Sequence, residues 1–203
     1  MNLENTVANL MQKLERHFYG KYRGFVVDND DPEKLGRLKV RVPSVLGNEV
    51  VTGWALACAP FGGANNQGML FIPEIEAGVW VEFEEGDLEF PIWAGTFWSK
   101  PDGESELPKT NAADGAEEEI QKPSTRKIIK TSKGHTIQFE DKDGEERITI
   151  VQIVDDDNKN VITMDADGIC ITDFTDNKIE MKADAFTITS AVDFSINATG
   201  NKV

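Results

Sequence analysis

The stretch that decides the fold is Val161–Val203, VITMDADGICITDFTDNKIEMKADAFTITSAVDFSINATGNKV. Apolar pairs recur along it, with one residue between the members of each pair: Ile162-Met164, Ile169-Ile171, Ile179-Met181, Phe186-Ile188 and Phe194-Ile196. Because side chains alternate between the two faces of a strand, both members of a pair lie on the same face. Strands this short cannot bury an apolar face alone, so neighbouring turns or neighbouring chains must cover it. The pattern predicts an elongated, multi-chain β-prism with a mechanical or scaffolding role.

The pairs also predict which side chains fill the axis of that prism. We expect the following residues to face inward as the needle core: Ile169, Ile171, Ile179, Met181, Phe186, Ile188, Phe194 and Ile196. A charge at one of these positions would be buried without a partner, and such burial is strongly unfavourable.

Composition limits the size and the class of the protein. The chain has 203 residues, of which 39% are apolar, and it includes four Trp and eleven Phe. This is enough for one or two modest domains with a real core. No run of apolar residues is long enough for a transmembrane helix. Residues 1–16 are charged throughout and lack the apolar segment of a secretory signal peptide, so we expect synthesis and assembly in the cytoplasm.

The charge balance argues against a nucleic-acid partner. The chain has 21 Lys and Arg against 36 Asp and Glu, a net charge of −15. Binding to phosphates needs clustered basic side chains. The two cysteines, Cys58 and Cys170, fit no metal or redox spacing and are expected to be small buried residues in a reducing compartment.

No pattern of catalytic or ligand-binding residues is evident. The Asp-rich stretches 28–31, 155–158 and 165–168 lack the further ligands of a calcium loop and are typical of turns. The lone His17 and His135 have no nucleophile pattern around them. We therefore expect no enzyme activity, no metal and no cofactor.

Four segments follow from the patterns along the chain. Residues 1–20 predict a short helix, whose stripe of Leu3, Val7, Leu10 and Leu14 suits packing on its own domain or between copies. Residues 21–100 predict a small β-barrel of about five strands. Residues 101–126 are rich in Pro, Gly and acidic residues and predict a linker. Residues 127–203 return to strands and form the needle.

Several motifs, in order, resemble phage baseplate assembly protein V and related VgrG-type spike proteins. The motifs are DPEKLGRLKVRVP at 31–43, GWALACAPFGG at 53–63, FIP at 71–73, GVWVEFEEGD at 78–87, FPIWAG at 90–95 and SKGHTIQFED at 132–141, with GEERI at 144–148. The resemblance extends from about Tyr22 to Ile150. Agreement of several motifs in order is far more specific than any one of them.

The resemblance implies a homotrimeric central spike of a contractile injection system, in which an OB-fold barrel precedes a triangular β-helix wound from three chains. The final location would be a virion tail or an injection-particle baseplate. The expected role is to cap the inner tube and to help puncture the target envelope. Baseplate hub and inner tube proteins would be its partners, and contact with the target membrane would be transient.

Two features depart from some members of the family. The segment 101–126 is too short to hold the lysozyme domain that some of them carry, and no His-x-His motif for a metal-bound tip occurs near the C-terminus. A PAAR-type protein is therefore the expected cap of the needle. The main alternative is a free-standing OB-fold protein that binds single-stranded nucleic acid or a glycan. An enzyme acting on cell-wall glycan is a second alternative, which the missing domain disfavours.

Overall fold

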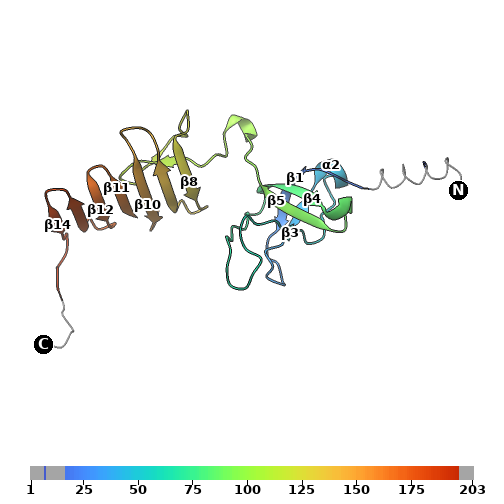
Figure 1. Ribbon diagram of the computed structural model, residues 1–203, viewed down its shortest axis with the longest axis horizontal. Helices are drawn as coiled ribbons and strands as arrows, with labels where there is room; N and C mark the ends of the chain where they lie inside the picture. The colour runs from blue at the N-terminus through green and yellow to red at the C-terminus, as the bar shows by residue number, and fades with distance from the viewer. Residues whose placement is uncertain (1–6, 8–16, 197–203) are drawn as a thin grey trace. The chain divides into compact units, whose positions relative to one another are not determined.

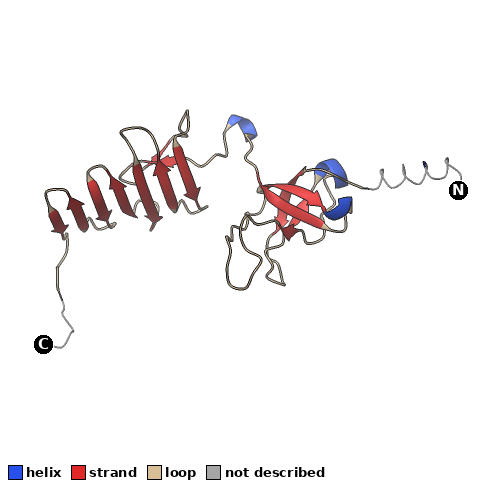
Figure 2. Ribbon diagram, viewed as in Figure 1, coloured by secondary structure: helices blue, strands red, loops and turns tan. Residues whose placement is uncertain are grey.

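The computed structural model describes Val7 and residues 17–196 of the chain. The short helix predicted within residues 1–20 lies, apart from Val7 and residues 17–20, outside the described residues. The chain divides into two units, Met1–Glu106 and Leu107–Val203. Strands dominate the described part of both units (Figure 2), as the alternating patterns predicted.

Unit 1 is a curled sheet whose strands pair antiparallel except for one short parallel pair. Its strands lie in the order β2-β1-β4-β5-β3 and are β1 (Tyr22–Asp28), β2 (Lys39–Arg41), β3 (Leu56–Ala57), β4 (Gly78–Phe83) and β5 (Pro91–Thr96). Leu38 and Ala55, which precede the two edge strands, exchange backbone hydrogen bonds of 3.1 and 2.7 Å. The edges of the sheet therefore meet, and the arrangement is consistent with an OB fold. The five strands lie within residues 21–100, where the sequence pattern predicted about five.

The core of unit 1 follows from strand alternation. Along β4, Val79, Val81 and Phe83 are buried while the residues between them are half-buried. The buried apolar side chains form one cluster: Val26, Leu38, Val40, Val42, Ala55, Val79, Val81, Phe83 and Trp93. The Trp93 indole Nε1 donates a hydrogen bond of 3.0 Å to the Gly36 carbonyl oxygen. The barrel is therefore filled by β-branched and aromatic side chains, which pack well on pleated strands.

Three short helical turns join the strands and the units. They are α2 (Pro43–Leu46), which begins with a proline at its first position, and the 3-10 turns η1 (Glu84–Gly86) and η2 (Pro101–Gly103). Pro43 starts α2 because its fixed φ suits the first helical position and its missing N–H would be unpaired there.

Unit 2 is an antiparallel meander, and Figure 1 shows its strands side by side in chain order. In the described residues its main sheet has seven strands in the order β14-β13-β12-β11-β10-β9-β8; we call it the meander sheet. The strands are β8 (Arg126–Lys130), β9 (Thr136–Glu140), β10 (Arg147–Ile153), β11 (Lys159–Asp165), β12 (Gly168–Thr172), β13 (Lys178–Lys182) and β14 (Phe186–Thr189). Each strand pairs with its neighbours in the sequence, so one chain makes this sheet through tight turns alone.

A small hairpin packs on one face of the meander sheet. Its strands β6 (Thr110–Asn111) and β7 (Glu117–Glu118) pair antiparallel. They belong to the segment 101–126, which the sequence pattern predicted as a linker, and unit 2 begins at Leu107. Thr163 Oγ1 in β11 donates a hydrogen bond of 2.8 Å to the Ala113 carbonyl oxygen in the turn of this hairpin. The glycine and acidic residues of this segment form the turn of the hairpin and its ion pairs, so residues 107–119 are not a flexible linker.

Asparagine side chains tie successive loops at one end of the strands. Asn160 Oδ1 accepts a hydrogen bond of 2.9 Å from the Phe174 amide, and Asn177 Oδ1 accepts one of 2.9 Å from the Ala191 amide. In both cases the donor follows the asparagine by 14 residues. The same device therefore joins β11 to the β12–β13 loop, and this loop to the segment after β14.

Candidate functional site: the apolar face of the meander sheet

Two rows of apolar side chains cross the meander sheet on one face. Residues directly opposite each other in an antiparallel pair point to the same side, so the strand register defines each row. The first row is Ile129, Ile137, Ile150, Ile162, Ile171, Ile179 and Ile188; the second is Phe139, Ile148, Met164, Ile169, Met181 and Phe186. The second row begins at Lys127, opposite Phe139. We call these thirteen apolar residues the apolar face.

The apolar face is open in the single chain. Eight of its residues are exposed: Ile129, Ile137, Phe139, Ile169, Ile171, Met181, Phe186 and Ile188. Phe186, in the edge strand β14, is 66% exposed. A contiguous apolar surface of this kind usually marks a site of protein–protein contact.

Six of the eight predicted needle-core residues lie together on this face. They are Ile169, Ile171, Ile179, Met181, Phe186 and Ile188. The other two, Phe194 and Ile196, follow β14 in an exposed segment that is not assigned to a strand. Residues of β8 to β11 continue the face but were not predicted as core. The sequence signal that could have placed residues of β9 and β10 on this face is the same alternation of apolar and polar residues, which occurs at 136–140 and 147–150.

The opposite face of the sheet is polar, and the β6–β7 hairpin covers part of it. Beneath the hairpin lie the buried polar side chains Thr136, Gln138, Glu140, Thr149 and Thr163. Arg126 Nε donates to Glu140 Oε2 at 2.5 Å, and the same guanidinium also contacts Glu118 of β7. Burial raises the pKa of Glu140, but hydrogen bonds from Thr125 and Arg126 outweigh it and lower this pKa to about 2. The hairpin is thus held by a buried, ionised network.

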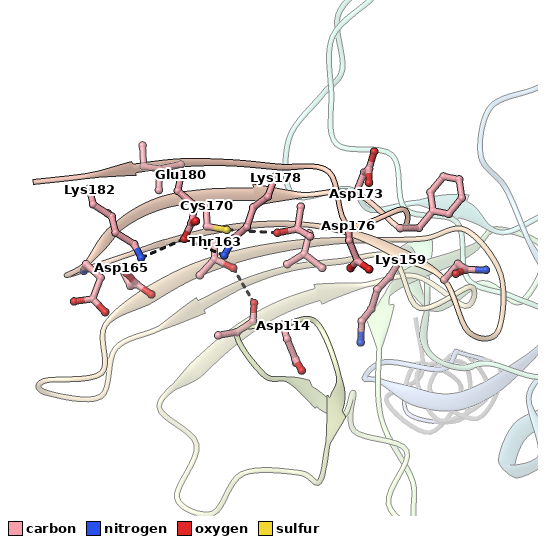
Figure 3. Close-up of a pocket in the computed structure, with 18 of the residues that line it drawn as sticks. Asp114, Lys159, Thr163, Asp165, Cys170, Asp173, Asp176, Lys178, Glu180 and Lys182 are labelled. Carbon is pink, nitrogen blue, oxygen red and sulfur yellow. Dashed lines mark hydrogen bonds and ion pairs between the residues drawn. The ribbon is translucent and has the colours of Figure 1, made fainter. Parts of the chain in front are cut away.

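Beyond the hairpin this polar face forms an open groove of about 560 Å³. Figure 3 shows Lys178, Glu180 and Lys182 along its lining. Glu180 Oε1 lies 2.9 Å from Lys178 Nζ and 3.2 Å from Lys182 Nζ, and the pKa of Glu180 is lowered by hydrogen bonds from these two lysines. Charges that neutralise one another suit a solvated surface. Within the described residues, no group of three His, Cys, Asp or Glu side chains is placed to hold a metal ion.

In unit 1, the motif at 31–37 is a turn built around one carboxylate. Asp31 is buried and accepts hydrogen bonds from the backbone amides of Glu33, Leu35 and Arg37. Arg37 Nη2 lies 2.6 Å from Asp31 Oδ1, and this contact holds the pKa of Asp31 well below its usual range. Gly36 occupies the left-handed region at φ 72°, which glycine adopts without strain. The motif fixes the entry into β2, so its role is structural.

The motifs of 31–95 thus lie in a curled five-stranded sheet and in the turns that connect its strands. Residues 22–98 match the family model of the type VI secretion system/phage-baseplate injector OB domain. The chain therefore resembles the spike proteins of contractile injection systems, as its motifs predicted. Comparison of the chain with curated proteins found no match.

The residues that match the injector OB domain fall entirely within unit 1, so the match does not extend to the meander sheet. The description of this family names the injector of type VI secretion systems and phage baseplates, and the match therefore suggests a baseplate-related role for unit 1. Among the described residues, no helix combines the length and the apolar character needed to cross a membrane.

Proposed function

We propose that this chain is the structural central spike of a contractile tail or injection particle, and that three copies form its needle. The observation that carries the proposal is the apolar face, which crosses all seven described strands of the meander sheet without a covering element. Three such sheets, each turning this face toward a common axis, make a triangular prism filled by Ile, Met and Phe. The injector OB domain supports the baseplate context.

Burial of the apolar face supplies enough free energy for stable assembly. Removing a half-exposed Ile, Met or Phe side chain from water contributes about 1 kcal/mol. Over the whole face the contribution is on the order of 10 kcal/mol per chain, which for three chains exceeds the entropic cost of association. Because each strand is also hydrogen-bonded to its neighbours, the prism is stiff along its length. Stiffness is the property that piercing an envelope needs.

In the proposed prism, the apolar face of each sheet lies inside and the polar face lies outside. The polar face carries the β6–β7 hairpin and the paired charges of Lys178, Glu180 and Lys182. Placing this face inward would bury those charges at a large cost in free energy. We therefore assign it to solvent, with no catalytic role.

The two units define the partners in this proposal. Unit 1, with its match to the injector OB domain, docks on the hub and caps the inner tube. In unit 2, β14 is the edge of the meander sheet within the described residues, with its exposed Phe186 and Ile188. An open apolar edge associates readily unless it is covered. A PAAR-type tip protein is the proposed cover.

The test is the solution mass and shape of the full chain and of two adjacent variants. Light scattering and small-angle X-ray scattering of the native chain should give an elongated particle of three copies. Phe186→Asp places three charges near the axis and should abolish this particle. Thr187→Asp is the matched control, because Thr187 is next in sequence but on the polar face, and it should assemble normally. A native monomer, or a normal trimer from Phe186→Asp, would overturn the proposal.

One observation favours a second candidate, a free-standing OB-fold protein for single-stranded nucleic acid or glycan. Cationic side chains lie over aromatic rings on the outer face of the barrel: the Arg23 guanidinium is 5.8 Å from the centre of Trp80, and Lys39 Nζ is 4.6 Å from that of Trp54. However, Lys39 is also paired with Asp28, and the chain has a net charge of −15. This candidate predicts a monomer whose ligand binding weakens with salt.

A further inference from the structure

A long stretch of unit 1 carries no charge. Residues 50–73 include none of the 21 Lys and Arg or the 36 Asp and Glu of the chain, and Glu49 and Glu74 flank the stretch directly. In a chain that is 28% charged, this composition identifies a surface that is chemically unlike the rest.

Most of this stretch is an exposed loop between β3 and β4. The loop leaves the strands of the barrel and returns to them (Figure 1). It presents the exposed apolar side chains Phe61, Met69, Leu70 and Phe71, of which Leu70 is 78% exposed. The tip is formed by Asn65, Asn66 and Gln67. Apolar side chains beside uncharged hydrogen-bonding groups are the composition of a protein–protein interface. We call residues 58–73 the uncharged loop.

The uncharged loop has a defined shape. The Met69 amide donates a hydrogen bond of 3.0 Å to the Phe61 carbonyl oxygen, and Ala64 bridges to Gln67 across the turn. At the base of the loop, Asn29 Nδ2 donates a hydrogen bond of 3.0 Å to the Pro73 carbonyl oxygen. Ile72 packs against the barrel core. A loop held in this way loses little conformational freedom when it binds, which favours its use as a contact surface.

We propose that the uncharged loop contacts the uncharged loop of a second copy of this chain, so that the barrels also touch in the assembled spike. This contact presupposes the trimer proposed above. Copies with a net charge of −15 repel one another, and like charges placed face to face oppose association. A surface on which copies meet must therefore be free of charge, and residues 50–73 provide such a surface in unit 1.

Partners of other chemistry fit the loop less well. A basic protein would be attracted to the acidic surfaces of the chain rather than to its uncharged part. An anionic lipid surface would repel the chain as a whole.

The test uses single cysteines in the full-length chain after Cys58→Ser and Cys170→Ser. Leu70→Cys, Met69→Cys and Phe71→Cys are each treated with a short bis-maleimide and resolved on a denaturing gel. The expected result is covalent dimers, because one thiol per chain and a reagent with two maleimides can join at most two chains. Glu89→Cys is the matched control, because it is exposed in the β4–β5 turn of the same unit, and it should stay monomeric on the gel.

The possible results separate this contact from the proposed trimer. If the particle has the mass of three chains and none of the three loop cysteines cross-links, the contact between loops is wrong and the trimer stands. If the native chain is a monomer, both proposals fail. A further measurement is flotation with vesicles of anionic phospholipid. Binding that Leu70→Asp abolishes would assign the loop to a lipid surface and overturn the contact between copies.

Discussion

Gln138 and Asn111 are joined by two hydrogen bonds although they are 27 residues apart. The Asn111 amide donates to Gln138 Oε1 at 2.9 Å, and Gln138 Nε2 donates to the Asn111 carbonyl oxygen at 2.8 Å. Gln138 is fully buried. Its side-chain amide pairs with the backbone of β6 as another strand would, and so fixes the β6–β7 hairpin on the meander sheet.

Replacing Gln138 with methionine should therefore release the hairpin. Gln138→Met keeps the volume but leaves the buried N–H of Asn111 without its partner and its C=O with only the 3.5 Å hydrogen bond from Arg126 Nη1. We expect a cost of about 2 kcal/mol in the free energy of unfolding. Chemical denaturation measures this change. Gln152→Met is the control, because Gln152 is exposed, and it should change stability by less than about 0.5 kcal/mol. Equal effects of the two substitutions would show that the amide pair does not hold the hairpin.

Glu140 should make the stability of unit 2 depend on acid pH. Its folded-state pKa of about 2 lies below the value of about 4.3 expected in the unfolded chain. The ionised carboxylate thus stabilises the fold above about pH 4.3, and this contribution is lost as the pH falls toward 2. Glu140→Gln should be less stable than the native chain by about 2 kcal/mol at neutral pH. The difference should shrink toward pH 2.

Thermal unfolding between pH 2 and 7 measures this dependence. Asp173, whose pKa is also lowered to about 2 by hydrogen bonds from Asn177 and Thr175, remains in both proteins and cancels from the difference. Glu145→Gln, at an exposed carboxylate, should follow the native curve. A constant difference between Glu140→Gln and the native chain across the pH range would contradict the assigned role of Glu140.

The two asparagine ties should differ in how far their loss is felt. Asn160→Ala removes the acceptor of the Phe174 amide, and Asn177→Ala removes that of the Ala191 amide. Asn160→Ala should raise hydrogen exchange at the Phe174 amide and leave the Ala191 amide unchanged, with a loss of about 1 kcal/mol in global stability. Asn177→Ala should raise exchange at both amides, because Asn177 Nδ2 also donates to Asp173 and Thr175 on either side of Phe174. Native-state hydrogen exchange resolves the two amides. Faster exchange at Ala191 in Asn160→Ala would contradict this assignment.

Gly168 should tolerate no side chain. It has φ +136°, and a Cβ built there would lie 2.0 Å from the Met181 carbonyl oxygen in the paired strand β13. Gly168→Ala must therefore separate β12 from β13 or distort the turn, and we expect a loss of at least about 2 kcal/mol. Gly144→Ala is the control for backbone strain alone, since Gly144 has φ +78° but open space around its Cα. It should cost less than Gly168→Ala in the same unfolding experiment.

The sequence by itself determined the strands and the face on which their apolar residues lie. Alternation with a period of two places Ile169 with Ile171 and Phe186 with Ile188, whatever their neighbours are. The ordered motifs of 31–95 likewise indicated the injector domain that the family model matches over 22–98. These features are local, because they depend on spacing within a few residues.

Only the tertiary structure decided how distant segments meet. The strand register joined the apolar pairs into rows that extend back to Ile129, beyond the residues predicted as core. It also placed Asn111, from a segment with the composition of a linker, against the buried Gln138. From the alternating pattern alone, a glutamine between two apolar residues of a strand is expected to face solvent. Its burial depends on contacts across 27 residues, which no local pattern records.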